Sequence, residues 1–308
     1  MIVVTGASGL LGASVLLCAR DLGREVVGLC HSHVLRISGV TIHKIDLTNG
    51  EATRVLIRKL NPKVIIHCAA AANVDWCEDH PHEAEQINVQ ASSVLAQLAA
   101  ELNAAFIYVS TDSVFDGEQG GYSESDEPRP INVYAMSKLR GEDEVLRYKS
   151  DAIIVRINIY GWNAQDKQSL AEWFLERLKA EKKVPGFTDV FFCPMLVNDL
   201  ADILIQILDA QLSGVYHVVA PDKISKYEFG RRVALQFGLD PNLVITSSLS
   251  QAKLRAARPR DVSLSTAKIE SALGRRMPDI TSGLARFQAL DQNGYARRLK
   301  QFLAGACA

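Results

Sequence analysis

The chain has 308 residues, enough for one large or two modest domains with a full hydrophobic core. Its formal net charge of -1, with acidic and basic residues interspersed, offers no footprint for nucleic acid or for an anionic membrane surface. The composition therefore favours a small neutral or anionic metabolite as partner, and it leaves open whether the chain forms a homodimer.

Targeting and metal signals are missing from the sequence. The N-terminus runs directly into apolar residues without a basic leader, and no apolar run approaches the length of a membrane span, so a cytoplasmic protein is expected. The six cysteines, at positions 18, 30, 68, 77, 193 and 307, form no CxxC pair, which predicts reduced thiols. Two close histidine pairs, 31/33 and 80/82, lack surrounding ligands, and no metal site is predicted.

The first predicted elements form a nucleotide-binding pattern. An apolar strand at residues 2–4 leads into the turn TGASGLLG (5–12), and a helical pattern follows at 15–22. Gly6 permits the tight turn, Gly9 lets the backbone approach a pyrophosphate, and Gly12 lets helix and strand pack closely. Although the spacing is GxxGxxG rather than GxGxxG, this order of elements predicts a dinucleotide site.

Strands and helices then alternate along the chain. Further strands are predicted at 25–30, 41–45, 64–67, 105–110 and 152–157, and helices at 51–60, 82–103 and 131–148. The pattern predicts an α/β fold with a Rossmann-type, doubly wound parallel sheet. Ligands of such sheets bind at the carboxyl ends of the strands, so Gly6, Ala69, Thr111 and the residues after Arg156 should meet around one ligand.

The alternation breaks after residue 160. Helices are predicted at 166–183, 198–209 and 225–237, a strand at 214–219, a loop-rich stretch at 187–195 and an amphipathic tail at 293–308. We predict a dinucleotide-binding domain at 1–160 and a mainly substrate-binding lobe at 161–308, with parts of 190–220 returning to the first domain.

Tyr134 and Lys138 stand four residues apart on the predicted helix 131–148, for which Asn132 is the expected N-cap. Residues at this spacing share one helix face, so the ammonium can stabilise the phenolate and the pair can transfer a proton. A YxxxK pair often occurs by chance on a helix surface. The glycine turn at the start of the chain is what favours the functional interpretation.

The motifs TGASGLLG (5–12), HCAAAANVDWCEDHP (67–81), STDSVFDG (110–117) and NVYAMSK (132–138) together resemble the extended short-chain dehydrogenase/reductase superfamily. Within it, the sequence is most similar to the dTDP-4-dehydrorhamnose reductase (RmlD-like) family. The resemblance implies that Tyr134 is the acid/base, that Lys138 holds the nicotinamide ribose and lowers the tyrosine pKa, and that Thr111 bonds the reacting oxygen. It also implies dinucleotide contacts from Gly6, Ser8, Gly9, Leu10, Leu11, Gly12, Asp46, Leu47, Ala69, Ala70, Ala71, Asn88 and Ser110.

The family's chemistry is hydride transfer from a reduced nicotinamide to the C4 carbonyl of a nucleotide sugar. Dehydratases of the superfamily carry a TDE motif, whereas here Ser113 follows Thr111 and Asp112, which favours simple reduction. Asp112 is expected either to brace its loop or to act in catalysis. The segment after Arg156 is one residue shorter than in the family. The substrate contacts we predict are Asn73, Trp162 and Arg258.

The end of the second strand bears on the choice of cofactor. An NAD site usually places an acid there, but here Cys30 is followed by His31, Ser32 and His33, and no acid occurs between residues 25 and 46. Ser32 and Arg36 could hold a 2′-phosphate. We therefore predict NADPH as cofactor, with NADH open if this loop is merely polar.

A second class of function has to be kept. The beta subunit of methionine adenosyltransferase resembles the same family, and the chain shares with it RPR (258–260) and VFDG (114–117). The alternative to an enzyme is thus a non-catalytic, dinucleotide-binding regulatory subunit. The enzyme is the favoured prediction.

Overall fold

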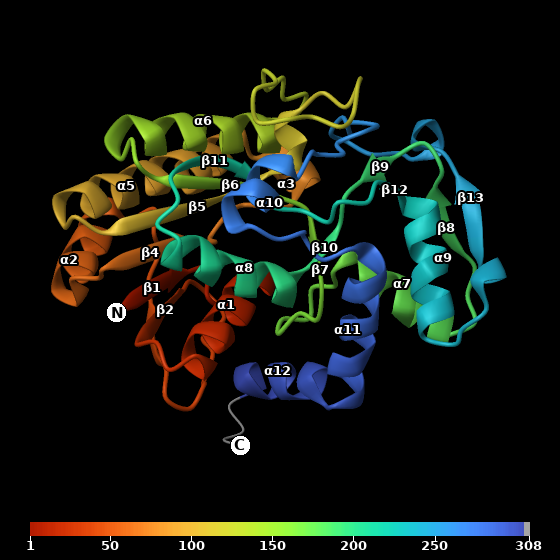
Figure 1. Cartoon of the computed structure of the whole chain (residues 1–308), viewed down its shortest axis with the longest axis horizontal. Helices are drawn as coiled ribbons and strands as arrows, with labels where there is room; N and C mark the ends of the chain where they lie inside the picture. Colours follow the sequence, from red (N-terminus) through yellow and green to blue (C-terminus); the bar gives the residue numbers. More distant parts are fainter. Residues whose placement is uncertain (305–308) are drawn as a thin grey trace.

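Seven parallel strands form the main sheet of the computed structural model, which describes residues 1–304 (Figure 1). The strands lie in the order β11-β6-β5-β4-β1-β2-β3. Their bounds are β1 Ile2–Thr5, β2 Val26–Cys30, β3 Thr41–Lys44, β4 Val64–His67, β5 Ala105–Thr111, β6 Ile153–Ile157 and β11 Gly214–His217. The chain winds outward from β1 to β3 and then crosses to β4 on the other side of β1. This order confirms the predicted doubly wound sheet.

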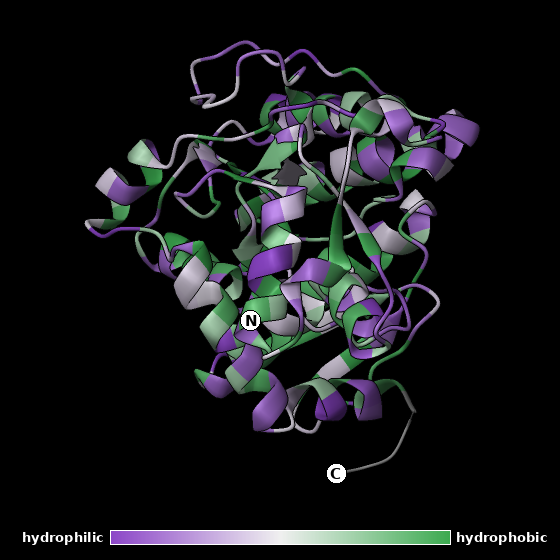
Figure 2. Cartoon of the chain, turned by 90° about the vertical axis from the view of Figure 1, so that its right-hand side faces the viewer, coloured by the Kyte–Doolittle hydropathy of each residue, from purple (hydrophilic) through white to green (hydrophobic). Residues whose placement is uncertain are grey.

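Successive residues of the central strands face opposite layers of the core. Val4 and Ile66 pack with α1 (Leu10–Asp21) and α8 (Val197–Asp209), whereas Val3 and Ile65 pack on the other face. That other face is covered by α2 (Gly50–Leu60), α5 (Ala91–Glu101) and α6 (Val133–Tyr148). Figure 2 shows hydrophobic segments gathered between these layers and polar ones outside. Because both faces of the sheet are buried, the sequences of these strands are almost continuously apolar.

Several helix ends follow local signals in the sequence. The C-cap of helix α2 is Asn61, which adopts a left-handed conformation with φ 47° and is followed by Pro62. Helix α6 begins after Asn132, whose side-chain Oδ1 accepts the amide of Ala135 at 2.8 Å, as predicted.

The predicted helix 166–183 is shorter in the structure, where α7 spans Leu170–Lys179. Ser169 caps it, because the Ser169 hydroxyl accepts the Glu172 amide and the Glu172 carboxylate accepts the Ser169 amide. This reciprocal capping box starts the helix four residues later than predicted.

The predicted helix 82–103 contains a change of winding. The chain forms α3 (Val74–Asp79) and α4 (Pro81–Glu85), then a π-helical turn, η1 (Gln86–Gln90), before α5. A single π-helical turn is too short to change the spacing of apolar residues noticeably, so the sequence did not predict it. Such turns often occur at functional sites. Here it carries the buried Asn88, whose side chain bonds to the backbone of Ala71 and to the Ser137 hydroxyl.

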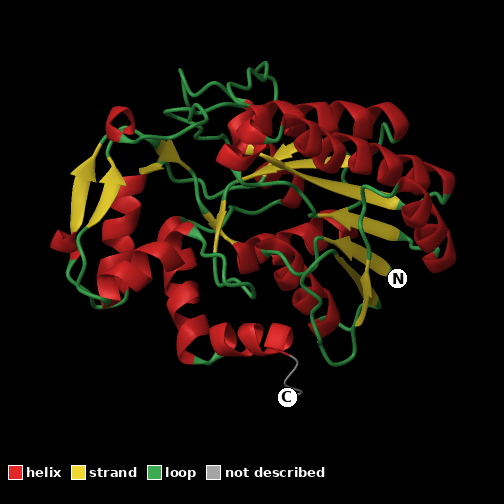
Figure 3. Ribbon diagram, turned by 180° about the vertical axis from the view of Figure 1, so that it is seen from behind, coloured by secondary structure: helices red, strands yellow, loops and turns green. Residues whose placement is uncertain are grey.

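A smaller lobe lies beside the main sheet, at the left of Figure 3. The aromatic rings of Phe174, Phe192, Phe229 and Phe287 form much of its core. Short strands lie within the predicted loop-rich stretch. Its elements are α7, β8 (Val184–Phe187), β9 (Phe191–Phe192), β12 (Ile224–Ser225), α9 (Lys226–Gln236), η3 (Pro241–Leu243), β13 (Val244–Ser247), η4 (Leu249–Gln251) and α11 (Ile280–Gln292).

Other segments join the lobe to the sheet. Strand β7 (Ile159–Tyr160) pairs with β10 (Met195–Leu196), and α8 and β11 return to the main layers. The remaining elements are η2 (Asp112–Val114), α10 (Ala267–Leu273) and α12 (Tyr295–Ala304). Helix α12 matches the predicted amphipathic tail up to residue 304, and positions 305–308, with Cys307, lie outside the described residues.

Candidate functional site

The turn after β1 leaves no room for side chains. Gly6 has φ 61°, and a Cβ there would lie 2.6 Å from the amide nitrogen of Ala69. A Cβ on Gly12 would overlap the carbonyl oxygen of Gly6. Gly9 is the N-cap of α1 and makes no side-chain cap, so the first amides of the helix remain free to bind an anion. The backbone thus forms a cradle that fits a pyrophosphate.

Two adjoining cavities meet at this turn. The first, of about 570 Å³, reaches the ends of β2 and β3, and the second, of about 500 Å³, reaches the ends of β5 and β6. They share Gly6, Gly9, Cys68, Ala70 and Gln165, so together they form one cleft along the carboxyl edge of the sheet. A long cleft centred on a glycine turn suits a dinucleotide.

Most of the predicted residues line this cleft. The first cavity is bordered by Gly6, Ser8, Gly9, His31, Ser32, Asp46, Leu47, Ala69 and Ala70. The second is bordered by Gly6, Gly9, Leu10, Leu11, Gly12, Ala70, Ser110, Thr111, Tyr134 and Lys138.

Tyr134 and Thr111 lie together in the second cavity, at the ends of α6 and β5 that face the cleft. Burial raises the pKa of the Tyr134 phenol to about 12; the Thr111 hydroxyl lowers this pKa and the Asp112 charge raises it. The phenol is therefore protonated at neutral pH, as a proton donor has to be.

Lys138 is buried, with 2% of its surface exposed. Its Nζ donates to the carbonyl of Val109 at 2.8 Å and lies 3.9 Å from the ring centroid of Tyr108. Burial lowers its pKa to about 7, against the opposing effect of Glu142. Burial raises the pKa of Tyr134, and Lys138 is not among the groups that shift it, so the expectation that Lys138 lowers this pKa stays a prediction.

Asp112 is a buried carboxyl group beside Thr111. It accepts hydrogen bonds from Asn158 Nδ2 at 2.6 Å and from the hydroxyls of Thr111 and Ser113 at 3.2 Å. Burial raises its pKa to about 6, although these bonds oppose the shift. The bonds show that Asp112 braces the loop after β5, one of the two roles expected for it.

Asn88 and Ser110 act on the cleft through other residues. The Asn88 amide accepts from the amide of Ala71 at 2.8 Å and donates to its carbonyl at 3.2 Å. It thereby holds the small residues after β4 in place. The Ser110 hydroxyl donates to Glu142, which is paired with Arg156 at 2.8 Å. Its side chain is thus bound within the protein.

Besides Ala71 and Asn88, four predicted residues do not line the cleft. Arg36 is exposed, and Asn73 caps α3 by accepting the amide of Trp76 at 3.0 Å. Trp162 stacks on Phe287 at 4.2 Å between ring centroids and donates to its carbonyl, so it packs inside the lobe.

Arg258 is the fourth. It pairs with Asp75 at 3.0 Å and borders a separate cavity of about 490 Å³ between the sheet and the lobe. Its place near the lobe is compatible with the predicted substrate contact.

Gln165 and Asn158 are two of the cleft residues that are absent from the predicted site. Gln165 donates to the carbonyl of Ser8 at 2.9 Å and borders both cavities. Asn158 positions Asp112. Asn158 follows β6 and could have been found from its place at a strand end, whereas no sequence signal marks Gln165.

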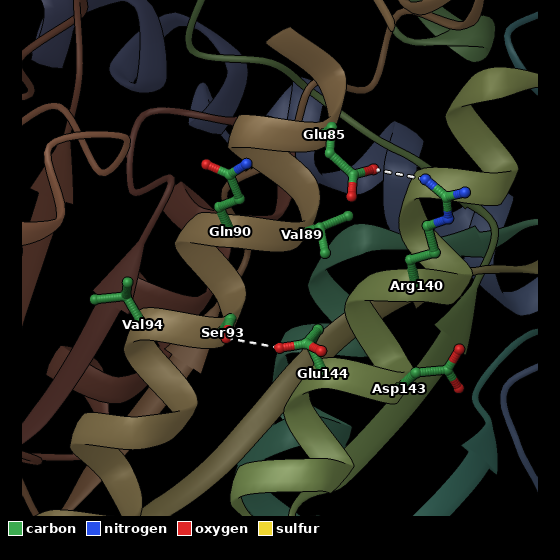
Figure 4. A pocket seen from close by; sticks show the side chains of 8 residues that line it. All are labelled: Glu85, Val89, Gln90, Ser93, Val94, Arg140, Asp143 and Glu144. Atoms are coloured by element: carbon green, nitrogen blue, oxygen red, sulfur yellow. Dashed lines mark hydrogen bonds and ion pairs between the residues drawn. The ribbon is translucent and has the colours of Figure 1, made fainter. Parts of the chain in front are cut away.

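A further hollow, of about 500 Å³, lies between α5 and α6 (Figure 4). Its polar groups pair with one another: Arg140 with Glu85 at 3.2 Å, and Ser93 with Glu144 at 2.9 Å. None of the predicted site residues borders it.

Two kinds of feature are absent from the described part of the chain. Within residues 1–304, no helix combines the length and apolarity needed to cross a membrane. The same residues hold no cluster of three or more His, Cys, Asp or Glu side chains arranged for a metal ion.

A doubly wound sheet with a glycine turn and with Thr, Tyr and Lys in one cleft defines the short-chain dehydrogenase/reductase class. Residues 1–292 match the family described as RmlD substrate binding domain. The probable low-salt glycan biosynthesis reductase of Haloferax volcanii is 36% identical over 290 residues, which are 93% of this chain and 96% of that protein. Methionine adenosyltransferase 2 subunit beta of Bos taurus is 32% identical over 287 residues, 90% of this chain and 84% of that protein.

Among solved structures, the dTDP-4-dehydrorhamnose reductase from Bacillus anthracis in complex with NADP has a TM-score of 0.83 and 26% identity, covering 94% of this chain and 98% of that one. The chain belongs to the RmlD substrate binding domain family, within the extended short-chain dehydrogenases/reductases.

Proposed function

We propose that the protein is an NADP(H)-dependent reductase that transfers hydride to the C4 keto group of a nucleotide-activated deoxysugar, as a dTDP-4-dehydrorhamnose reductase does. The observation that carries this proposal is the protonated phenol of Tyr134 beside Thr111, in a cavity continuous with the glycine turn. Reductases among the relatives, and a similar structure with NADP, support it.

The residues present fit a dinucleotide, because the glycine turn leaves free amides and no side chain where a pyrophosphate would lie. When bound, a reduced nicotinamide supplies the hydride. Lys138 uses one of its three donors on Val109, which leaves two for ribose hydroxyls. These contacts would fix the reacting end of the cofactor against the floor of the cavity.

Tyr134 then gives its proton to the alkoxide that develops at the sugar oxygen. The Thr111 hydroxyl donates to Asp112 at 3.2 Å. If this hydroxyl rotates, it can donate its own hydrogen bond to the sugar oxygen instead and hold that oxygen in line with Tyr134. The residue directly after Asp112 is Ser113 and not an acid. The proposal is therefore reduction without loss of water.

The cofactor preference we propose is for NADPH and is modest. Ser32 borders the cavity at the adenine end, but Arg36 does not. The carboxylate of Asp46 lies 3.9 Å from His31 Nε2, so an acid that is distant in sequence comes close to the predicted phosphate site. That carboxylate would disfavour a 2′-phosphate in part, which keeps NADH open.

Two measurements test the proposal. Titration of NADPH and NADH against the purified protein should show tighter binding of NADPH, and tighter NADH would exclude the phosphate site. Oxidation of NADPH should be followed at 340 nm with dTDP-, UDP- and GDP-linked 4-keto sugars. Turnover of none of them would contradict the reductase.

A second candidate is a regulatory subunit that binds the dinucleotide without turnover. It is favoured by the likeness to methionine adenosyltransferase 2 subunit beta. Stoichiometric co-purification with another enzyme from source extract, together with the absence of turnover, would favour this candidate. Turnover with no such partner would exclude it.

A further inference from the structure

Helix α12 packs on the core of the molecule but lies outside both cavities of the cleft. Its Leu299 has 1% of its surface exposed, and the Tyr295 hydroxyl accepts a hydrogen bond from Asn198 Nδ2 of α8 at 3.1 Å. The family match ends at residue 292, before α12 begins. None of residues 295–304 borders either cavity. Any effect of this helix on the cleft therefore has to pass through another segment.

One contact of α12 reaches the loop 163–169, five of whose residues border the second cavity. The Lys300 Nζ donates to the backbone carbonyl of Gln165 at 2.6 Å and lies 3.6 Å from the carboxylate of Asp166. The Gln165 side chain in turn donates to the carbonyl of Ser8, in the glycine turn, at 2.9 Å. Because Gln165 borders both cavities, these bonds connect α12 with the place where the cavities meet.

A second contact of α12 reaches the loop after β2. The carbonyl of Phe302 accepts a hydrogen bond from the backbone amide of Arg36 at 2.8 Å. His31 and Ser32 of the same loop border the first cavity, at its adenine end. One helix outside the cleft thus holds two loops that line it, one beside each cavity.

We propose that α12 is a brace of the dinucleotide site and that Lys300 is a positioning residue, which acts through Gln165. Loops that are already bonded in the free protein need not be ordered when the ligand binds, so less conformational entropy is lost on binding. Dinucleotide affinity should therefore depend on a helix that does not touch the ligand. The coupling is reciprocal, so a bound dinucleotide should stabilise α12 as well. This inference rests on the proposed function, because it takes the cleft as the dinucleotide site.

The first test is calorimetric titration of NADPH into the full chain. Lys300→Gln should raise the Kd of NADPH by about 3- to 10-fold, the worth of a charge-assisted hydrogen bond whose donor is half exposed. Lys300→Arg can donate to the same carbonyl and should stay within about twofold of the wild type. Arg297→Gln is the matched control. It removes the same charge from an exposed position of the same helix and should change the Kd by less than about twofold.

The second test is hydrogen–deuterium exchange of the backbone amides with and without NADP⁺. Bound NADP⁺ should slow the exchange of the Arg36 amide and of residues 295–304 in the wild type, and it should slow the exchange of 295–304 less in Lys300→Gln.

An unchanged Kd in Lys300→Gln, or unchanged exchange of residues 295–304 on NADP⁺ binding, would overturn the inference and leave the proposed reaction untouched. A wild type that reduces none of the 4-keto sugars, but whose NADPH affinity depends on Lys300, would refute the proposed reaction and leave the brace standing. A wild type that binds neither NADPH nor NADH would refute both.

Discussion

Two of the seven histidines are buried, and we expect them to make the fold sensitive to acid. His67 Nδ1 contacts the Thr5 hydroxyl at 2.6 Å, and its Nε2 contacts the Ser92 hydroxyl at 3.0 Å. His217 Nδ1 donates to the carbonyl of Tyr122 at 3.1 Å, and its Nε2 has no partner among residues 1–304. Both rings are accommodated in the neutral form.

Burial lowers the pKa of each imidazole from 6.5 to about 3. Between these values the unfolded chain binds protons that the native protein does not, so stability falls as the pH drops below 6.5. At pH 5, one and a half units below the unfolded pKa, each histidine costs about 2 kcal/mol.

Asp112 acts in the opposite direction. Burial raises the pKa of Asp112 from 3.8 to about 6, so at pH 5 this carboxyl group binds a proton in the native protein but not in the unfolded chain. The native state is thereby stabilised by about 1 kcal/mol at pH 5. The three groups together predict a net loss of about 3 kcal/mol between pH 8 and pH 5. That is a large part of the 5–15 kcal/mol typical of a folded protein.

Thermal unfolding at pH 8, 6.5 and 5 measures this loss, and a fall in Tm of about 5–10 °C is expected. His217→Gln keeps a donor for Tyr122 and should remove about 2 kcal/mol of the pH dependence. His82→Gln, at an exposed position, is the control and should change nothing. An unaltered midpoint from pH 8 to pH 5, or an unaltered slope in His217→Gln, would refute the reasoning.

Three further changes test the site. Tyr134→Phe should reduce turnover by about 100-fold or more while NADP⁺ affinity is kept, and an active variant would exclude Tyr134 as the proton donor. Gly12→Ala places a methyl group on the carbonyl of Gly6, so dinucleotide affinity should fall, whereas Gly50→Ala, with its nearest contact at 3.6 Å, should bind normally. Trp162→Ala removes a ring packed in the lobe and should cost about 3 kcal/mol of stability with little effect on the Michaelis constant, while the reverse result would return Trp162 to the substrate site.

Features of the fold and site that rest on local spacing could be predicted from the sequence. The order of strand, glycine turn and helix identified the cradle, since Gly6 and Gly12 are required by contacts within the first twelve residues and at Ala69. The four-residue spacing of Tyr134 and Lys138 identified one helix face. The rule that ligands bind at the carboxyl ends of parallel strands then brought distant segments to one edge.

What the sequence by itself could not determine depends on contacts between segments far apart in the chain. Burial, which is a tertiary property, raises the pKa of Tyr134, a shift that the Lys138 spacing did not indicate. Trp162 lies after a strand end, where site residues are expected, yet its side chain packs in the core of the lobe and donates a hydrogen bond to the carbonyl of Phe287. The closeness of Asp46 to His31 exists only once β2 and β3 have paired in the sheet, because no local pattern encodes a distance between two strand ends.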